Sequence, residues 1–554
     1  MDTSRVLITV IISLILIFAY QELVLKRLYP PQTHPMSEES PSVAASPVGM
    51  PSAIPATEAS PLAIAPPAAM SPAAAAAPEH TYEVETSLFV ATFTSRGARL
   101  KSFRLKDYRQ SAGKQSPPYE MVQTPPGGLL PLGAIATREG KTLDDHEIAY
   151  SSSAPAHIDV NSGGYGTLTF DGETAAGLKL EKTFTFGDKS YAFEMEVTER
   201  GPKVPDELGV SLSQSLAALQ GYRDIPELQA DVQDKVFTEQ EKKLRQGIPP
   251  VAGTITYAGF GDRYFLSVFL PTHPASGTVA MAYLDNEAIA RVLFDHTDHV
   301  STRVYIGPKL LDALESVNPA LHHAIDFGWT GVLALIFLRA LKLFHFVAPN
   351  WGVDILLMTV AIKVAFLPLS IKSQRSMLKM QRLQPQMERL KEKFKDNNEQ
   401  LQREMMDLYK RNHVNPLGGC APMALQLPIF IGLYEALLNS VELRHAPFAW
   451  WIDDLSKPDC LPISWMPTIP YLDCHGLPVL VILMGVSSLA QQWLTPTSPD
   501  PNQQRMMMLT PLIFTVMLIN FPSGLVLYYF ASNMLGVIQQ YFLNREMKAY
   551  TPAT

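Results

Sequence analysis

The placement of long apolar windows limits the possible folds of this chain more than any other feature. One window runs from Val6 to Leu25, and all the others begin after residue 350; each is long enough to cross a bilayer. The 554 residues are too many for one core, and a formal net charge of -8 does not suggest nucleic-acid binding. The sequence therefore predicts a polytopic α-helical membrane protein with a large water-exposed insert.

Six membrane spans are expected. The five in the C-terminal half cover residues 351–371, 417–438, 477–493, 506–521 and 523–542. The N-terminal window could also be a cleaved signal peptide. No small-x-small cleavage site follows it, which favours an uncleaved signal anchor over residues 1–29.

The charges of two loops predict the orientation of the spans. Residues 372–414 contain an excess of Lys and Arg, whereas the loop after residue 438 is acidic. Basic loops stay in the cytoplasm, so both termini are expected inside and the insert outside. Within 372–414 two stretches of apolar residues at helical spacing, separated by DNNEQ, predict a helical hairpin. The apolar stripe would mainly pack the hairpin upon itself, although a Met-rich face could also contact a flexible partner.

The insert changes character along its length. Residues 30–80 are rich in Pro, Ala and Ser and have no aromatic residue, which predicts a disordered linker. Residues 81–317 alternate polar and apolar positions, clearest in LEKTFTFGDKSYAFEMEVTE, and predict an antiparallel β-sandwich. Residues 318–349 predict an amphipathic helix lying in the membrane interface. The core then covers 350–544, followed by a short cytoplasmic tail, 545–554.

No constellation of catalytic or metal-ligating residues stands out. The histidines of the insert are scattered, and the His296-x-x-His299 pair is better explained by a solvated turn. Ser523 and Gly524 resemble a protease Ser-Gly pair, but the spans supply no histidine. We therefore expect neither an enzyme nor a cofactor. Cys460 and Cys474 share the acidic loop and are expected to form a disulfide bond.

A lysine stands in the middle of the second span, in the stretch DILLMTVAIKVAFLPLS. A cation there costs ~2.5–3.5 kcal/mol, so Lys363 needs a reason. It lies ~12 Å from the cytoplasmic end of its helix. Polar residues of the other spans reach about the same depth, and the expected groove set is Lys363, Thr359, Gln426, Ser487, Thr515, Tyr529, Ser532 and Asn533. Because polar groups facing lipid are costly, these residues are expected to enclose a hydrated groove open to the cytoplasm.

Lys363 could instead have a purely structural or a transport role. Snorkelling would have to cover ~12 Å with a reach of roughly 6 Å, and Glu435 lies about 15 Å away along the helix axes. A neutral lysine held by Gln426 and hydroxyl groups is a further alternative. A secondary transporter could also use this lysine as a coupling or substrate site, although no inverted repeat is visible.

Several long motifs resemble one known family. NPLGGCAPMALQLPIFIGLYEALLNSVELRHAPF, the pair QPQM and QREMMDLYK, and FPSGLVLYYFASN are similar to the YidC-type membrane protein insertases in their Gram-negative form. The resemblance implies a monomeric insertase and chaperone of the bacterial inner membrane. It would have a five-helix insertase core and a periplasmic β super-sandwich. The family commonly has an arginine where this chain has Lys363.

The resemblance also implies partners. These would be nascent membrane proteins, the lipid bilayer and the Sec translocon, while the basic hairpin is the candidate contact for a ribosome or a targeting receptor. A cationic groove would take the polar part of a nascent segment while its apolar helix enters lipid.

Overall fold

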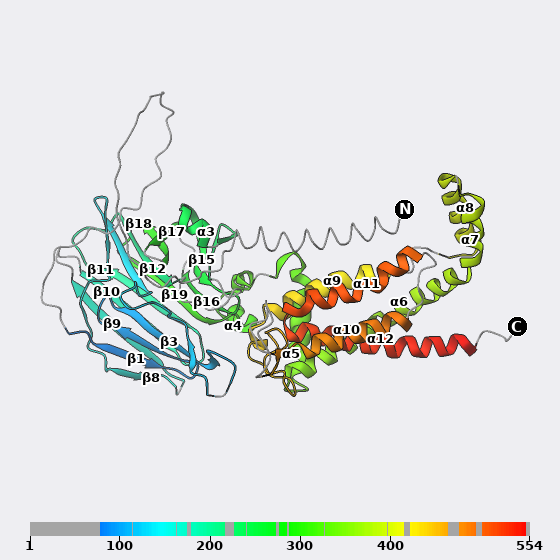
Figure 1. The fold of residues 1–554 in the computed structure, drawn as a ribbon. Helices are drawn as coiled ribbons and strands as arrows, with labels where there is room; N and C mark the ends of the chain where they lie inside the picture. Colours follow the sequence, from blue (N-terminus) through cyan, green and yellow to red (C-terminus); the bar gives the residue numbers. More distant parts are fainter. Residues whose placement is uncertain are drawn as a thin grey trace, which may run out of the picture. The chain divides into compact units, whose positions relative to one another are not determined.

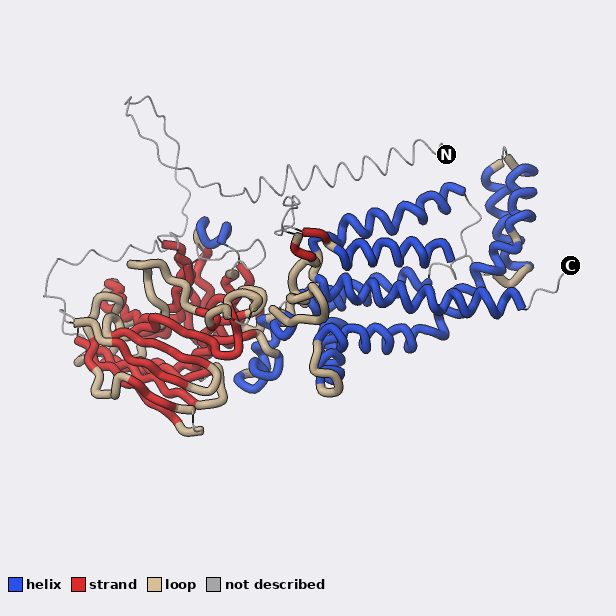
Figure 2. The backbone as a smooth tube through the Cα atoms, turned by 60° about the horizontal axis from the view of Figure 1, so that its bottom comes forward, coloured by secondary structure: helices blue, strands red, loops and turns tan. Residues whose placement is uncertain are grey.

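The computed structural model describes residues 78–549 except 114, 162, 174–178, 216–225, 240, 273–275, 285–286, 326, 396, 415–420, 464–475 and 495–500. The predicted signal anchor and the Pro/Ala-rich linker up to residue 77 therefore lie outside the described residues. The described part consists of a β-rich region followed by a helical region (Figures 1 and 2).

Two sheets make up the β-rich region. The smaller sheet has the order β4-β3-β2-β1-β8, and only the β1–β8 pair within it is parallel. Its strands are β1 (Thr81–Glu85), β2 (Phe89–Thr94), β3 (Arg99–Arg109), β4 (Pro118–Glu120) and β8 (His157–Asp159). Strands β2 and β3 place Phe93 and Phe103 against Phe184 and Phe193 of the larger sheet, with ring centroids 4.7 and 6.4 Å apart. The two sheets therefore share one aromatic core.

The larger sheet is antiparallel and runs β6-β5-β12-β18-β17-β15-β16-β19-β11-β10-β9-β7, with β13 on β15 and β14 on β13. Its strands are β5 (Gly133–Arg138), β6 (Lys141–Asp144), β7 (Tyr150–Ser151), β9 (Tyr165–Glu173), β10 (Lys179–Gly187), β11 (Ala192–Glu199), β12 (Glu207–Ser215), β13 (Glu227–Val232), β14 (Lys235–Glu239), β15 (Ile248–Gly261), β16 (Phe265–Pro271), β17 (Ser276–Leu284), β18 (Glu287–Asp295) and β19 (His299–Pro308). Helix α3 (Glu241–Gln246) lies between β14 and β15.

The hairpin predicted from alternation is present as β10 and β11. Phe184 pairs with Met195 across the two strands, and both side chains are fully buried. Glu194, which lies between the buried Phe193 and Met195 in β11, is exposed, as expected for a sheet with one wet face. The predicted antiparallel sandwich character is thus confirmed.

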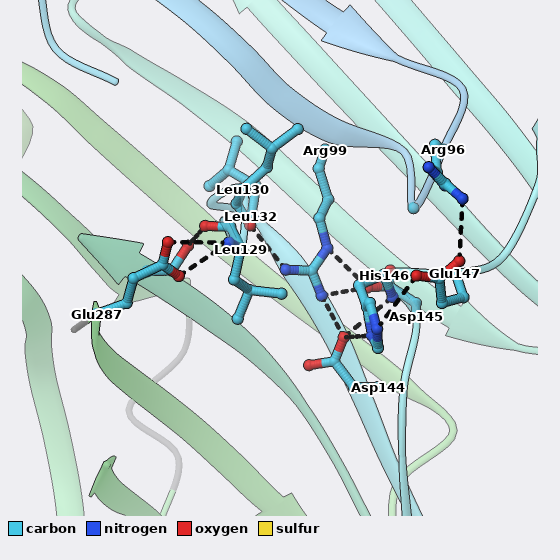
Figure 3. Close-up of polar contacts among 12 residues, drawn as sticks. Arg96, Arg99, Leu129, Leu130, Leu132, Asp144, Asp145, His146, Glu147 and Glu287 are labelled. Carbon is cyan, nitrogen blue, oxygen red and sulfur yellow. Dashed lines mark hydrogen bonds and ion pairs between the residues drawn. The ribbon is translucent and has the colours of Figure 1, made fainter. Parts of the chain in front are cut away.

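A buried cluster of charges lies in the core of the β-rich region, where alternation predicts apolar side chains. Arg99 of β3 donates to the Leu130 carbonyl (2.7 Å) and to the carboxylates of Asp144 and Asp145, as Figure 3 shows. Lys182 of β10 also pairs with Asp145 and donates to the carbonyls of Gly97 (2.8 Å) and Leu132 (2.9 Å). Each cation is matched by buried acceptors, so this cluster joins the two sheets.

The helical region begins with short turns and an amphipathic helix. It comprises α4 (Leu311–Val317), η2 (Pro319–Ala324), η3 (Gly328–Thr330), α5 (Gly331–His345), α6 (Trp351–Arg382), α7 (Gln384–Lys393), α8 (Asn398–Arg411), α9 (Ala421–Leu438), η5 (Val441–Leu443), α10 (Val479–Leu494), α11 (Pro501–Met517), η6 (Leu518–Asn520) and α12 (Ser523–Ala549). A short ribbon, β20 (Leu461–Pro462) with β21 (Gly476–Leu477), precedes α10. Helix α12 packs against α6, α9 and α10, and Figure 1 shows α10 and α12 lying together.

The spans are supported unequally by the described helices. One stretch, Trp351–Met377 within α6, is long and apolar enough by itself to cross a membrane. Shorter apolar helices cover Gln426–Leu438, Val479–Leu494 and Met508–Asn520. The described residues thus agree with a membrane-embedded helical core, while the number six stays a prediction.

Helix α6 is longer than the span predicted for it. The apolar window ends near Ile371, but the helix continues to Arg382 because Lys and Arg are good helix formers in water. It stops there because Pro385 has no N–H and its ring would clash with the carbonyl four residues earlier. The chain then restarts as α7.

Candidate functional site

Lys363 lies midway along α6 with its side chain half-buried. Within the described part of the chain, its ammonium has no hydrogen-bond or ion-pair partner. Thr359, one turn earlier, is buried and donates to the Ile355 carbonyl of its own helix at 2.6 Å. Thr359 is therefore satisfied locally, whereas the cation of Lys363 has unused donors.

Gln426 of α9 lies against α12 rather than holding Lys363. Its amide donates to the hydroxyl of Tyr528 at 2.9 Å, and Tyr528 is almost fully buried. The neighbouring Tyr529, which belongs to the expected groove set, packs its ring against Phe430 and Phe514 at 5.4 and 5.6 Å between centroids. Tyr528 was missed; since a buried tyrosine hydroxyl needs a partner, the Tyr-Tyr pair itself was the available signal.

Ser487 and Asn533 bind each other across α10 and α12. The Asn533 amide donates to Ser487 Oγ at 3.2 Å and lies 3.4 Å from the Met484 carbonyl, and both side chains are buried. Ser532 is buried beside Asn533. Thr515 of α11 donates to the Pro511 carbonyl and lies against Gly485 of α10, where a Cβ would be only 2.7 Å from Thr515 Oγ1. These polar residues therefore also take part in the packing of α10 against α11 and α12.

A third polar contact joins α12 to α6. Gln539 donates to Ser370 Oγ at 2.9 Å, two turns after Lys363 on α6. Helix α12 therefore makes side-chain hydrogen bonds with α9, α10 and α6. Of the expected groove residues, Gln426, Ser487 and Asn533 take part in these contacts between helices. Thr359 and Thr515 donate within their own helices. Lys363 has no bond to any of them among the described residues.

The intramembrane carboxylate does not pair with Lys363 in the described chain. Glu435 accepts a hydrogen bond from Asn439 at 3.0 Å, one turn later in the sequence. This contact lies near the opposite end of α9 from Gln426.

The hairpin formed by α7 and α8 has a small core of its own. Leu383, Met387 and Val414 are buried there, and Met405 and Tyr409 pack against them. The apolar stripe therefore packs the hairpin upon itself, as expected. Its outer surface carries exposed cations: Arg389, Lys393, Lys395, Arg403, Lys410 and Arg411.

Helix α5 has two different faces. Phe337, Leu338 and Leu341 are buried, and Gly432 of α9 lets α5 approach closely, because a Cβ there would lie 2.8 Å from Leu333 Cβ. The other face exposes Val332, Ile336 and Leu343, and Phe346 and Val347 directly after the helix are exposed as well. Such exposure suits a helix partly immersed in lipid.

The cysteine and histidine predictions are tested only in part. Cys460 is disulfide-bonded. Cys474 lies outside the described residues, so its pairing with Cys460 stays a prediction. His296 is exposed in the turn before β19, as expected, whereas His299 is the exposed first residue of β19 and contacts Thr198 Oγ1 of β11 at 2.9 Å.

One group in the described chain brings metal-ligating atoms together: Glu83, Glu85 and His157, within 4.8 Å. Both carboxylates already pair with cations, Glu83 with Arg104 at 3.5 Å and Glu85 with Lys106 at 2.8 Å. We therefore interpret the group as a surface ion cluster.

Comparisons with known proteins cover almost the whole described chain. Residues 342–550 match the family model described as 60Kd inner membrane protein, and residues 81–205 and 222–339 match that of the YidC periplasmic domain. A solved structure titled as an active YidC insertase with its first transmembrane domain resolved is 16% identical, covers 84% of this chain and 95% of its own, and has a TM-score of 0.36.

Relatives are also similar over most of their length. The membrane protein insertase YidC of Citrifermentans bemidjiense is 36% identical over 558 residues, which cover 98% of this chain and 99% of the relative. The membrane protein insertase YidC of Geobacter sulfurreducens is 36% identical over 483 residues, which cover 84% of this chain and 86% of the relative. This chain belongs to the YidC family of inner-membrane insertases and carries that family's periplasmic domain.

Proposed function

We propose that this protein inserts and helps fold proteins of the bacterial inner membrane, and that insertion depends on the charge of Lys363. Membership of a family named for membrane protein insertion supports the first part. The observation that carries the second part is a half-buried lysine on a membrane helix, with no partner in the described chain. A buried charge without a protein partner is costly and is a candidate for a functional group.

The ammonium acts by its electric potential and not by covalent chemistry. A nascent segment often has a few acidic or polar residues that must cross the apolar layer. A hydrated groove around Lys363 shortens the low-dielectric path of those residues, and the positive charge attracts them. Because any cation provides this potential, Lys363 can replace the arginine common in the family.

The apolar part of the substrate takes a different route in this proposal. It slides along the outer faces of α9 and α12 and partitions into lipid, where burial of its side chains supplies the driving force. The membrane potential acts on substrate charges at about 2.3 kcal/mol per charge per 100 mV. No chemical energy source is needed.

The remaining expected partners fit particular surfaces. The exposed cations of α7 and α8 suit the acidic surface of a ribosome or of a targeting receptor, and the exposed apolar face of α5 suits the bilayer. We also propose that the protein cooperates with the Sec translocon and acts as a monomer. The comparisons give no support to the alternative of an ion-coupled transporter.

The test is complementation of cells depleted of their insertase, with protein levels measured by blotting. Lys363→Arg is expected to support insertion, and Lys363→Ala and Lys363→Glu to abolish or severely reduce it at normal protein levels. Lys372→Ala is the matched control, because this exposed lysine lies on the same helix beyond the apolar window. Full activity of Lys363→Ala would refute the electrostatic role and leave sliding along the apolar helices as the mechanism.

A further inference from the structure

An apolar groove lies on the helical region away from the polar contacts described above. Its volume is about 350 Å³. The floor is α12, with Phe530, Ala531 and Met534, while α6 and α10 form the two walls and the loop 448–452 forms the roof. Every lining residue is hydrophobic. The groove is not part of the hydrated site around Lys363.

The roof of the groove has an unusual backbone. Trp450 adopts a φ of 55°, in the left-handed region that bulky residues rarely occupy. A hydrogen bond from the Phe448 N–H to the Ile452 carbonyl at 2.9 Å closes this turn. The indole of Trp450 points outward and remains 86% exposed. The fold therefore maintains a strained turn that presents a large aromatic ring at the mouth of the groove.

A buried carboxylate fixes the second tryptophan of the roof. Asp459 accepts from Trp451 Nε1 at 2.8 Å and from the Leu480 N–H, the first turn of α10, at 2.5 Å. Burial raises the pKa of Asp459, and these two hydrogen bonds act in the opposite direction. Trp451 is thereby tied to the wall formed by α10, so the roof is held rigidly over the floor.

We propose that this groove binds one acyl chain of a membrane phospholipid, from the leaflet level with the loop 448–452. Tryptophans collect at the boundary between headgroups and acyl chains, which places the mouth of the groove at that depth. Apart from the two indoles of the roof, the lining offers no hydrogen-bonding side chain, as a hydrocarbon requires. A volume of about 350 Å³ is in the range of ligand pockets for small molecules.

Width favours an acyl chain over a protein helix as the occupant. A helix with its side chains is ~10 Å across. A hydrocarbon chain is much narrower and can extend further along the walls. One turn beyond Val360 and Met534, Val364 and Ile538 are both well exposed on α6 and α12, and they continue the apolar track towards the middle of the membrane.

The test is photolabelling of the full chain in vesicles of phosphatidylethanolamine and phosphatidylglycerol. A trace of phosphatidylethanolamine carries a diazirine in one acyl chain, and labelled peptides are quantified by mass spectrometry. We expect label in residues 448–452 and 530–535 to exceed that in 512–516 of α11, another exposed apolar surface, by about five-fold, which corresponds to ~1 kcal/mol of preferential binding. Equal labelling of both surfaces would overturn the proposal, since it would indicate ordinary surrounding lipid.

Two filling variants and one control make the assignment specific. Ala531→Trp fills the floor and Val360→Trp fills one wall; either is expected to reduce groove labelling to the level of α11. Val516→Trp adds the same side chain to a position of α11 that is 63% exposed, and should leave groove labelling unchanged. Undiminished groove labelling in both folded filling variants would refute the site.

A second measurement identifies a protein occupant directly. Photoreactive methionine is incorporated into the chain, and crosslinks from Met534 are mapped. Crosslinks to lipid support the proposal. Crosslinks to residues 6–25 of the same chain would overturn it, because the occupant would then be the N-terminal apolar window. Neither measurement requires insertion activity, so the outcome is independent of the function proposed for Lys363.

Discussion

Two regions of this molecule bury cations, and they treat them in opposite ways. In the β-rich region Arg99 and Lys182 are almost inaccessible, and each is surrounded by carboxylates and carbonyls that match its donors (Figure 3). In α6, Lys363 is half-buried and has no such partner in the described chain. A buried cation whose donors all have acceptors stabilises one arrangement of the fold. A cation without acceptors can instead attract a substrate through its electric potential.

The largest effect is expected from removing the shared carboxylate of the β-rich region. Asp145→Ala leaves Arg99 and Lys182 buried without their common anion, and should destabilise this region by about 3–5 kcal/mol. Hydrogen exchange of amides in β3 and β10 measures the loss. Glu147→Ala is the control, since its pair with Arg96 is 60% exposed on both sides and should contribute under about 1 kcal/mol. Equal effects of the two substitutions would remove the distinction between matched and surface charges.

The opposite result is expected for the lysine of α6. Lys363→Met replaces a costly cation by an apolar side chain of similar length, so the helical region should keep its stability or gain up to ~3 kcal/mol. Unfolding in mixed micelles with increasing denaturing detergent measures the change. A loss of more than ~1 kcal/mol would mean that Lys363 has a stabilising partner, and the comparison between the two regions would fail.

Acid provides a graded test of the matched cluster. Burial alone would raise the pKa of Asp144, but the charge of Arg99 and the hydrogen bond from His146 outweigh it and hold the pKa at about 2, below its ordinary 3.8. A lowered carboxyl pKa stabilises the fold above pH 3.8, and this contribution, about 2 kcal/mol, disappears as the pH falls towards 2. Hydrogen exchange in β3 and β10 should show this loss, and Asp144→Asn should flatten the profile there.

The sequence predicted the periodic features of the fold and missed those that depend on distant partners. Alternation identified the β10–β11 hairpin, because Phe184 and Met195 follow the period of two. By the same period Lys182 falls on the buried face with Phe184, whereas its charge would place it on the wet face. Alternation alone does not decide between the two. The core position of Lys182 depends on carbonyls of Gly97 and Leu132, which are far away in the chain. No local pattern contains that information.

The candidate site shows the same limit. Lys363 was identifiable because a cation within an apolar window is rare. The expected groove set contains Gln426 and Tyr529 but not Tyr528, which is the residue that Gln426 contacts. Adjacent residues differ by about 100° around a helix, and the sequence does not fix that rotation. The strained turn at Trp450 was missed entirely, because its closing hydrogen bond sets a backbone conformation that residue type disfavours.

The smallest expected effect concerns the neutral polar contact between α10 and α12. Asn533 and Ser487 form a hydrogen bond of 3.2 Å in a buried position, and such contacts between membrane helices contribute about 0.6 kcal/mol on average. A double-mutant cycle with Asn533→Ala and Ser487→Ala, followed by unfolding in mixed micelles, isolates this energy. If the coupling exceeds ~3 kcal/mol, neutral pairs stabilise the helical region as strongly as charges stabilise the β-rich one. If the coupling energy is small while Asn533→Ala still impairs insertion, Asn533 contacts the substrate. The proposed groove would then contain a neutral polar residue that acts on the substrate together with Lys363.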